Sequence, residues 1–131
     1  MLEFDSTEEK SFPQKETTEK IIGAAFEVHR HLGYGFLERV YQRAMQVELV
    51  RQGLKAEIER RLTVRYKDAI VGDYDADLYV ADGVIVEIKA SPQYDKRDEA
   101  QILNELKAAS ISVGLLINFG RAKVEFKRFV F

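Results

Sequence analysis

Apolar positions recur at helical spacing in the first half of the chain. Ile22, Phe26, His29 and Leu32 follow that spacing, and Thr17 or Thr18 provides a start signal before them. This pattern predicts a helix from about residue 18 to the glycines at 33 and 35. A second stripe between positions 40 and 50 predicts a helix over residues 37–52, which ends at Gly53.

The period changes to two after Gly53, which is typical of strands. Alternating residues predict strands over 58–66, 71–80 and 84–90, with a turn at Lys67-Asp68. A helix is expected over 98–110, a strand buried on both faces over 113–119, and an amphipathic strand over 124–130. The order α-α-β-β-β-α-β-β predicts an α/β fold: a mixed sheet with helices on both sides. Residues 1–17 are expected to form a polar, flexible leader before a single domain at 18–131.

The amino-acid composition excludes several classes of function. The 131 residues include no cysteine, which excludes disulfides, zinc–thiolate sites and thiol catalysis. No apolar run approaches about 18 residues, so no membrane contact is expected. A polar N-terminus argues against a secretory signal, and a cytoplasmic protein is the simplest interpretation. The net charge of −2 gives no strongly basic nucleic-acid footprint.

The most informative segment is the hairpin of residues 74–90, which turns at Asp82-Gly83. A two-residue loop would pair residues whose numbers sum to 165, and a three-residue loop would pair those that sum to 164. Only the second register gives one fully apolar face, whose members are Ala76, Leu78, Val80, Val84, Val86 and Ile88. It places Asp77 opposite Glu87 and Asp75 opposite Lys89 on the other face, with Cβ atoms about 4.5–5.5 Å apart.

Two facing carboxylates favour a divalent cation, because otherwise they repel each other. Mg²⁺ is commonly held by one or two carboxylates together with waters and phosphate oxygens. Lys89 lies two residues beyond Glu87 on the same face, where its ammonium would act on a water or on a phosphate. The alternative is a solvated sheet face on which Asp75 and Lys89 form an ordinary ion pair. Against that alternative, aspartate is depleted in strands and like charges directly opposite are destabilising.

These residues resemble a known signature. Asp77 followed by Glu87 and Lys89 matches the D…(D/E)-x-K pattern of the PD-(D/E)XK nuclease superfamily. Gly35, Glu38 and Tyr41 match the motif that names the GxxExxY protein family. Segments 71–77, 84–90, 100–108 and 114–120 also resemble that family in order and spacing, and together the likeness covers about residues 18–131.

The resemblance implies a restriction-endonuclease-like fold with a metal-dependent phosphodiester-cleaving site. It makes Asp77 and Glu87 metal ligands with Glu38 completing the shell, and it makes Lys89 the catalytic lysine. Gln101 matches a polar residue close to such sites, although its spacing from Asp98 also suits a capping box. Two positions depart from the family pattern: Asp75 stands where arginine is common, and Asp98 stands where histidine is common.

The first functional hypothesis is therefore a nuclease that uses Mg²⁺ or Mn²⁺ and acts on DNA or RNA. A homodimer is a further expectation, because cutting both strands of a duplex usually requires two sites. The alternatives are a catalytically silent nuclease-like module that binds nucleic acid or a protein, and a hydrolase of a smaller phosphoester. Two basic clusters offer phosphate contacts, each alternating with apolar residues as edge strands also do: Arg60, Arg61, Arg65 and Lys67, and Arg121, Lys123, Lys127 and Arg128. A nuclease requires an open, basic-rimmed cleft over the Asp77/Glu87 face.

Overall fold

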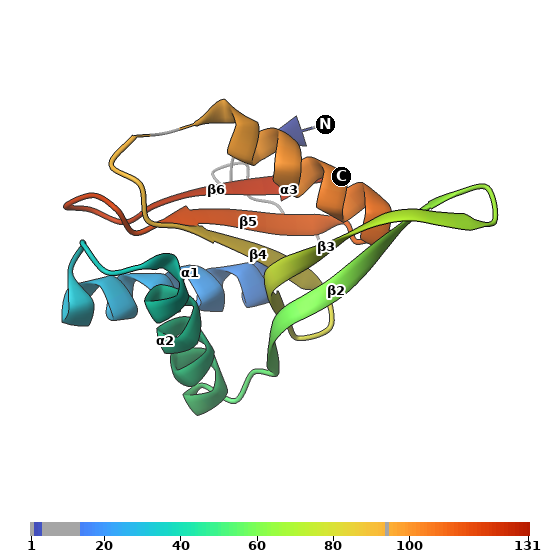
Figure 1. Ribbon diagram of the computed structural model, residues 1–131. Helices are drawn as coiled ribbons and strands as arrows, with labels where there is room; N and C mark the ends of the chain where they lie inside the picture. Colours follow the sequence, from blue (N-terminus) through green and yellow to red (C-terminus); the bar gives the residue numbers. More distant parts are fainter. Residues whose placement is uncertain (1, 4–13, 94) are drawn as a thin grey trace.

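A single mixed sheet organises the protein. In residues 2–3, 14–93 and 95–131, which the computed structural model describes, six strands follow the order β1-β6-β5-β4-β3-β2 (Figure 1). In chain order the elements are β1 (Leu2–Glu3), α1 (Lys15–Leu32), α2 (Glu38–Arg51), β2 (Ala56–Tyr66), β3 (Ala69–Val80), β4 (Val84–Lys89), α3 (Lys96–Ala109), β5 (Val113–Asn118) and β6 (Glu125–Val130). Strands β4 and β5 are parallel, because α3 crosses over between them, and the other neighbours are antiparallel. The predicted α/β class and element order are confirmed, and the short β1 was not predicted.

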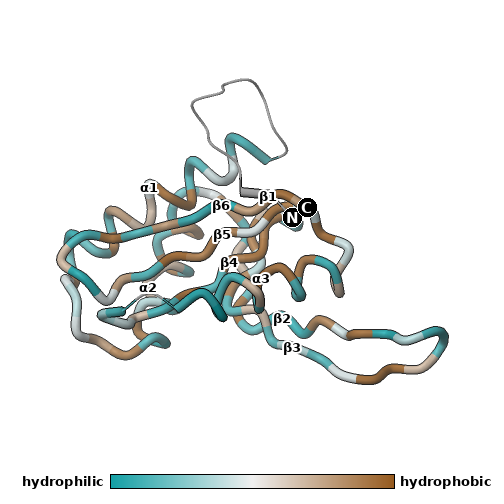
Figure 2. The backbone as a smooth tube through the Cα atoms, turned by 90° about the horizontal axis from the view of Figure 1, so that it is seen from above, coloured by the Kyte–Doolittle hydropathy of each residue, from teal (hydrophilic) through white to brown (hydrophobic). Residues whose placement is uncertain are grey.

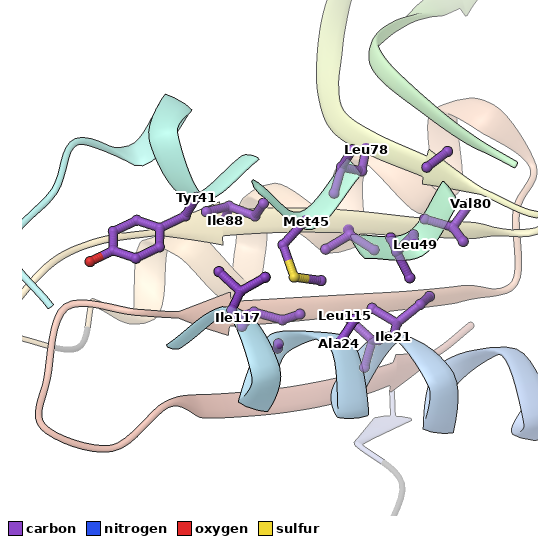
Figure 3. Packing of buried hydrophobic residues seen from close by; sticks show 14 of the residues in the cluster. Ile21, Ala24, Tyr41, Met45, Leu49, Leu78, Val80, Ile88, Leu115 and Ile117 are labelled. Carbon is purple, nitrogen blue, oxygen red and sulfur yellow. The ribbon is translucent and has the colours of Figure 1, made fainter. Parts of the chain in front are cut away.

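Helices cover both faces of the sheet, as the sequence predicts. Helices α1 and α2 pack on one face, and α3 packs on the other (Figure 1). On the first face Ile21 of α1 and Met45 of α2 meet Leu78, Ile88 and Leu115 of the sheet, all of them fully buried (Figure 3). This core fixes β3 and β4, the two strands that carry the candidate acids.

The second core is smaller and lies under α3. Ile102 and Leu106 of α3 contact Ile85 and Leu116 of the sheet. Gly114 of β5 allows the helix to approach closely, since a Cβ there would lie 3.0 Å from the Ile102 side chain and 3.2 Å from that of Leu106. Helix α3 is therefore held directly over β4 and β5.

The β2–β3 hairpin extends beyond the body of the protein (Figures 1 and 2). The two strands pair from Ala56↔Val80 to Tyr66↔Ala69, with a register shift between Val64 and Arg65. Apolar side chains at the far end are exposed, including Tyr66 and Ile70. The predicted turn at Lys67-Asp68 is confirmed.

Two helices begin earlier than the sequence suggests. Helix α1 starts at Lys15 rather than near Thr17, and α3 starts at Lys96 rather than at Asp98. The N-cap of α3 is Asp95, whose side chain accepts a hydrogen bond from the Arg97 N–H at 2.9 Å. Most of the expected leader, residues 1 and 4–13, lies outside the described residues. No helix in the described part of the chain is long and apolar enough to cross a membrane.

Candidate active site

Asp77 and Glu87 lie where the β3–β4 ladder stops. The predicted register is confirmed by the pairs Leu78↔Val86, Tyr79↔Ile85 and Val80↔Val84. Beyond these pairs, side-chain carboxylates rather than backbone carbonyls accept the hydrogen bonds between the two strands. The Asp77 Oδ2 accepts a hydrogen bond from the Ile88 N–H at 2.7 Å, and the Glu87 Oε2 accepts one from the Asp77 N–H at 3.3 Å. The two acids are therefore brought together as predicted, and each is tied to the opposite strand.

The backbone is also irregular on the β2 side of Asp77. The β2–β3 ladder passes from Ile58↔Leu78 to Arg60↔Ala76, and Glu59 between them has a left-handed φ of 57°. The strict alternation predicted for β3 fails at this point. Ala76 packs in the core under α3, whereas Leu78 packs in the core under α1 and α2. The prediction that both residues share one face is therefore wrong.

The predicted pairing of Asp75 with Lys89 is wrong as well. Asp75 lies opposite Arg61 of β2, and their side chains form an ion pair at 3.2 Å. Lys89 instead pairs with Asp98 of α3 at 3.5 Å, and both side chains are about a fifth exposed. The extrapolation fails because the β3–β4 ladder ends before it reaches these positions.

Glu87 is buried beneath α3 with Glu105, an acid that the sequence analysis did not single out. Glu87 is 3% exposed and Glu105 is fully buried. Burial, the adjacent Glu105 side chain and the charge of Asp77 together raise the pKa of Glu87 to about 11. Within the described part of the chain the Glu105 Oε1 has no hydrogen-bond partner. The neutral form of Glu87 is thus favoured in the metal-free protein.

Burial also acts on the other two members of the motif. It raises the pKa of Asp77, although the hydrogen bond from Ile88 opposes that shift. Burial alone lowers the pKa of Lys89, but the carboxylates of Asp98 and Glu38 outweigh it and the net shift is upward. Lys89 is therefore an ammonium at neutral pH, suited to stabilising negative charge rather than to accepting a proton.

Helix α2 contributes two polar residues on the side that faces β3. Glu38 is its first residue and is exposed, and its charge raises the pKa of both Asp77 and Lys89. Gln42, one turn later, is 5% exposed and donates a hydrogen bond from its Nε2 to the Asp77 carbonyl at 3.0 Å. Glu38 is therefore close to the predicted acids, and Gln42 fixes the backbone that carries Asp77.

Tyr41 positions the loop that leads into α2. Its ring stacks on Phe119 with centroids 4.6 Å apart, and its hydroxyl donates to the Gly33 carbonyl at 2.6 Å. The same hydroxyl accepts from the Phe36 N–H at 3.3 Å. Gly35, Glu38 and Tyr41 thus form one local unit in which the tyrosine supports the loop, and its hydroxyl contacts backbone groups rather than a site carboxylate.

In the part of the chain that the structure describes, Gln101 is linked to the site through Glu105. Its Nε2 donates to the Glu105 Oε2 at 3.0 Å, and Glu105 lies against Glu87. The capping-box alternative for Gln101 is not realised, because Asp95 caps α3 and Asp98 sits within its first turn.

A cleft of about 350 Å³ opens beside Lys89. Lys89, Arg121 and Lys127 line it together with Asp98 and Glu125, whereas Asp77 and Glu87 lie outside its lining. Arg121 pairs with Glu125 at 3.0 Å, and Lys127 pairs with Glu99 at 3.1 Å. The cleft is therefore rimmed by cations that nearby acids partly neutralise.

Comparison with known proteins agrees with this geometry. A sequence model of the PD-(D/E)XK nuclease superfamily matches residues 15–129, which is most of the chain. The chain belongs to the PD-(D/E)XK nuclease superfamily. That the superfamily signature falls on Asp77, Glu87 and Lys89 stays a prediction, as does the assignment to the GxxExxY family within it.

A solved structure has a similar fold. The protein is similar to the one described as "Crystal structure of SSO0001", with a TM-score of 0.57 and 16% identity. The alignment covers 89% of this chain and 58% of that one, so the protein spans little more than half the length of this neighbour. At this identity the likeness concerns the fold alone. No curated protein matches the chain.

The donor set of the PD-(D/E)XK site suits a hard divalent cation. Asp77 and Glu87 provide carboxylate oxygens, and Glu105 adds a buried oxygen that has no hydrogen-bond partner among the described residues. A bound cation would offset the cost of ionising Glu87 in this buried position beside Asp77. Among residues 2–3, 14–93 and 95–131, no three histidine or acidic side chains converge tightly enough to enclose a metal alone. Waters and phosphate oxygens would complete the shell, as they commonly do for Mg²⁺.

Two residues of the site escaped the sequence analysis, although each carried a signal. Glu105 falls on the buried stripe of α3 beside Ile102 and Leu106, where a charged residue is unexpected. Gln42 falls on the buried stripe of α2, four residues after Glu38. A polar residue at an apolar stripe position is the pattern that would have found both.

Proposed function

We propose that the protein is a metal-dependent nuclease that hydrolyses phosphodiester bonds of DNA or RNA. The single observation that carries this proposal is the juxtaposition of Asp77 and Glu87 at the end of the β3–β4 ladder, with Lys89 beside them. Membership of the superfamily supports it. In the proposal Asp77 and Glu87 hold Mg²⁺ or Mn²⁺, and Glu38 contributes from the start of α2.

Each residue near the proposed metal has its own role in the reaction. Lys89, which is cationic, stabilises the negative charge that develops on the phosphate and orients the attacking water. Gln42 holds Asp77 through the backbone, and Glu105 with Gln101 holds Glu87 from the side of α3. A bound metal would polarise phosphate oxygens and lower the pKa of a water.

The test is a cleavage assay on single- and double-stranded DNA and RNA with Mg²⁺ or Mn²⁺. Wild type is compared with Lys89→Ala and Glu87→Gln, and with Lys96→Ala as a matched control. Lys96 is an exposed lysine in the first turn of α3. Loss of one charge-stabilising group at a reacting centre typically costs at least about 100-fold. We expect that loss in the first two variants and wild-type activity in Lys96→Ala.

Purification of the four proteins in parallel controls for contaminating nucleases. Equal activity in all four would point to a contaminant and contradict the assignment of the site. The absence of cleavage in every arm would equally contradict a nuclease.

A second candidate function is a nuclease-like module that binds nucleic acid without cutting it. The observation that favours it is the burial of Glu87, which is 3% exposed beneath α3, together with a cleft that reaches Lys89 but neither acid. Binding that persists without cleavage in wild type would establish this alternative.

Location and assembly are part of the same proposal. A cysteine-free nuclease-like domain suits the reducing cytoplasm, where we place it. A homodimer would supply two sites for a duplex, and light scattering on the purified protein gives its mass directly.

A further inference from the structure

The loop that leads into Glu38 presents apolar side chains to solvent beside the candidate site. Tyr34 is 62% exposed, Phe36 is 46% exposed and Leu37 is 71% exposed. Two glycines with positive φ shape the loop, Gly33 at 71° and Gly35 at 111°. Because the Tyr41 hydroxyl bonds to backbone groups on both sides of Tyr34, the loop is fixed from within. The exposed side chains of Tyr34 and Phe36 are therefore carried on a fixed backbone, and the Phe36 ring also packs edge-on against Tyr41.

Two arginines continue this surface along α2. Arg39 and Arg43 are exposed and one turn apart, and neither forms an ion pair or hydrogen bond with another residue that the structure describes. Several cations elsewhere do form such pairs. Arg61 pairs with Asp75, and Lys89 pairs with Asp98. The guanidinium groups of Arg39 and Arg43 are thus available for an anionic partner.

The position of these arginines relates them to the site. Gln42 donates to the Asp77 carbonyl, and Gln46 donates to the Ala56 carbonyl at 2.9 Å, so this side of α2 faces β2 and β3. Residues three apart are neighbours on a helix surface. Arg39 therefore adjoins Gln42, and Arg43 adjoins Gln46. Arg39 therefore lies where α2 meets β3, the strand that carries Asp77, and Arg43 lies one turn further, where α2 meets β2.

We propose that this surface, formed by Tyr34, Phe36, Leu37, Arg39 and Arg43, binds single-stranded nucleic acid and delivers it to the site. The proposal rests on the proposed nuclease function and specifies its substrate as a strand with unpaired bases. Arginines that track phosphates beside exposed aromatic rings that stack on bases are the usual means of single-strand binding. A duplex offers phosphates to the arginines but hides the faces of its bases from the rings.

Binding is measured by fluorescence anisotropy in EDTA, so that nothing is cleaved. The probes are labelled 20-nucleotide oligo(dT) and oligo(U), a 20-base-pair DNA duplex, and an abasic strand of equal length. The proteins are Lys89→Ala as the uncut background and the further variants built on it. We expect both base-bearing single strands to bind more tightly than the duplex and the abasic strand.

The variants separate the two contributions. Replacing Arg39 and Arg43 together by Gln lowers the slope of log K against log salt by about 1.4, since each phosphate contact on a single strand contributes about 0.7. Tyr34→Ala weakens oligo(dT) binding roughly 5- to 150-fold, the range measured for loss of one stacked base, and leaves the abasic strand unaffected. Tyr34→Phe keeps the ring and restores affinity. Arg51→Gln serves as the matched control and binds like the background protein, because Arg51 is an exposed arginine in the last turn of α2, nine residues after Gln42 and so on the opposite side of the helix.

Several results would overturn the inference. One is tighter binding of the duplex, and another is an unchanged salt slope in the double arginine variant. A larger loss in Arg51→Gln than in the double arginine variant would also overturn it, as would no binding of any probe, which would favour a protein partner. The outcome is independent of the cleavage assay. If the protein binds single strands but does not cleave them, the proposed nuclease function is contradicted and the binding surface is not. If it cleaves without this binding pattern, the binding surface is contradicted and the nuclease function is not.

Discussion

The carboxyl group of Glu87 is buried between β4 and α3, where its neutral form is favoured. Its pKa rises from 4.5 to about 11, first through burial and then through Glu105 and Asp77. A folded-state pKa above the unfolded value means that the native state binds the extra proton. The resulting stabilisation is complete below the unfolded pKa of 4.5 and is lost as the pH rises towards about 11.

Glu87→Gln is therefore expected to stabilise the metal-free protein at pH 8. An amide mimics the neutral carboxyl, because it accepts from the Asp77 N–H as Glu87 does and donates an N–H towards the adjacent Glu105 side chain. Urea unfolding in EDTA between pH 5 and pH 9 measures the effect. One titrating group changes the free energy of unfolding by up to about 1.4 kcal/mol per pH unit. The free energy of unfolding should therefore depend less steeply on pH in Glu87→Gln than in wild type.

Glu16→Gln provides the comparison for this measurement, since Glu16 is exposed in the first turn of α1. The free energy of unfolding of Glu16→Gln should vary with pH as it does in wild type. Identical slopes in wild type and Glu87→Gln would contradict the buried, proton-binding role assigned to Glu87.

At the scale of elements, the turn after β5 supports the end of β4. A Cβ on Gly120 would lie 2.5 Å from the Ser91 carbonyl oxygen and 2.6 Å from the Ala90 carbonyl carbon. Asn118 links the same segments, because its Oδ1 accepts from the Ser91 N–H at 3.1 Å and from the Gly120 N–H at 3.0 Å. The residues directly after Lys89 are thus clamped against the β5–β6 turn.

Gly120→Ala should push this connection outward. Overpacking against backbone typically costs about 1–3 kcal/mol of unfolding free energy, which chemical denaturation measures. Because Ala90 and Ser91 follow Lys89, the proposed cleavage activity should fall together with the free energy of unfolding. Gly23→Ala is the control: a Cβ in that helical position meets nothing within 4 Å, and the change should stabilise by about 0.5–1 kcal/mol. Equal stability of the Gly120 variant and wild type would show that the contact relaxes freely.

Helices and strands could be predicted from the sequence wherever one hydrophobic periodicity continues without interruption. The alternation around Asp82-Gly83 gave the register of β3 and β4, because a slip by one residue would expose a whole apolar face. The same alternation misplaced Ala76 and Asp75, because the ladders break at Asp77 and the later contacts depend on β2. Glu105 was missed for a related reason, since its neighbour Glu87 belongs to another element 18 residues away in the sequence.

At the scale of the whole molecule, the candidate metal donors exist as a set only in the folded chain. Asp77 comes from β3, Glu87 from β4 and Glu38 from α2, and two packed cores hold these elements together. A ligand that binds the native state and not the unfolded chain stabilises the fold. A metal held by these carboxylates, as proposed, would therefore couple its affinity to the stability of the entire domain.

Mn²⁺ or Mg²⁺ should accordingly raise the melting temperature of the wild-type protein above its value in EDTA. At a concentration 100 times the dissociation constant the gain is about 2.7 kcal/mol, or roughly 10 °C for a domain of this size. Asp77→Asn should abolish most of this shift, because it removes one of the two central carboxylates. Asp75→Asn, two residues earlier on the same strand, should keep it, since Asp75 faces Arg61 rather than Glu87. A metal-induced shift of the same size in both variants would place the cation elsewhere, because the two substitutions remove the same charge and differ only in which neighbour the side chain faces.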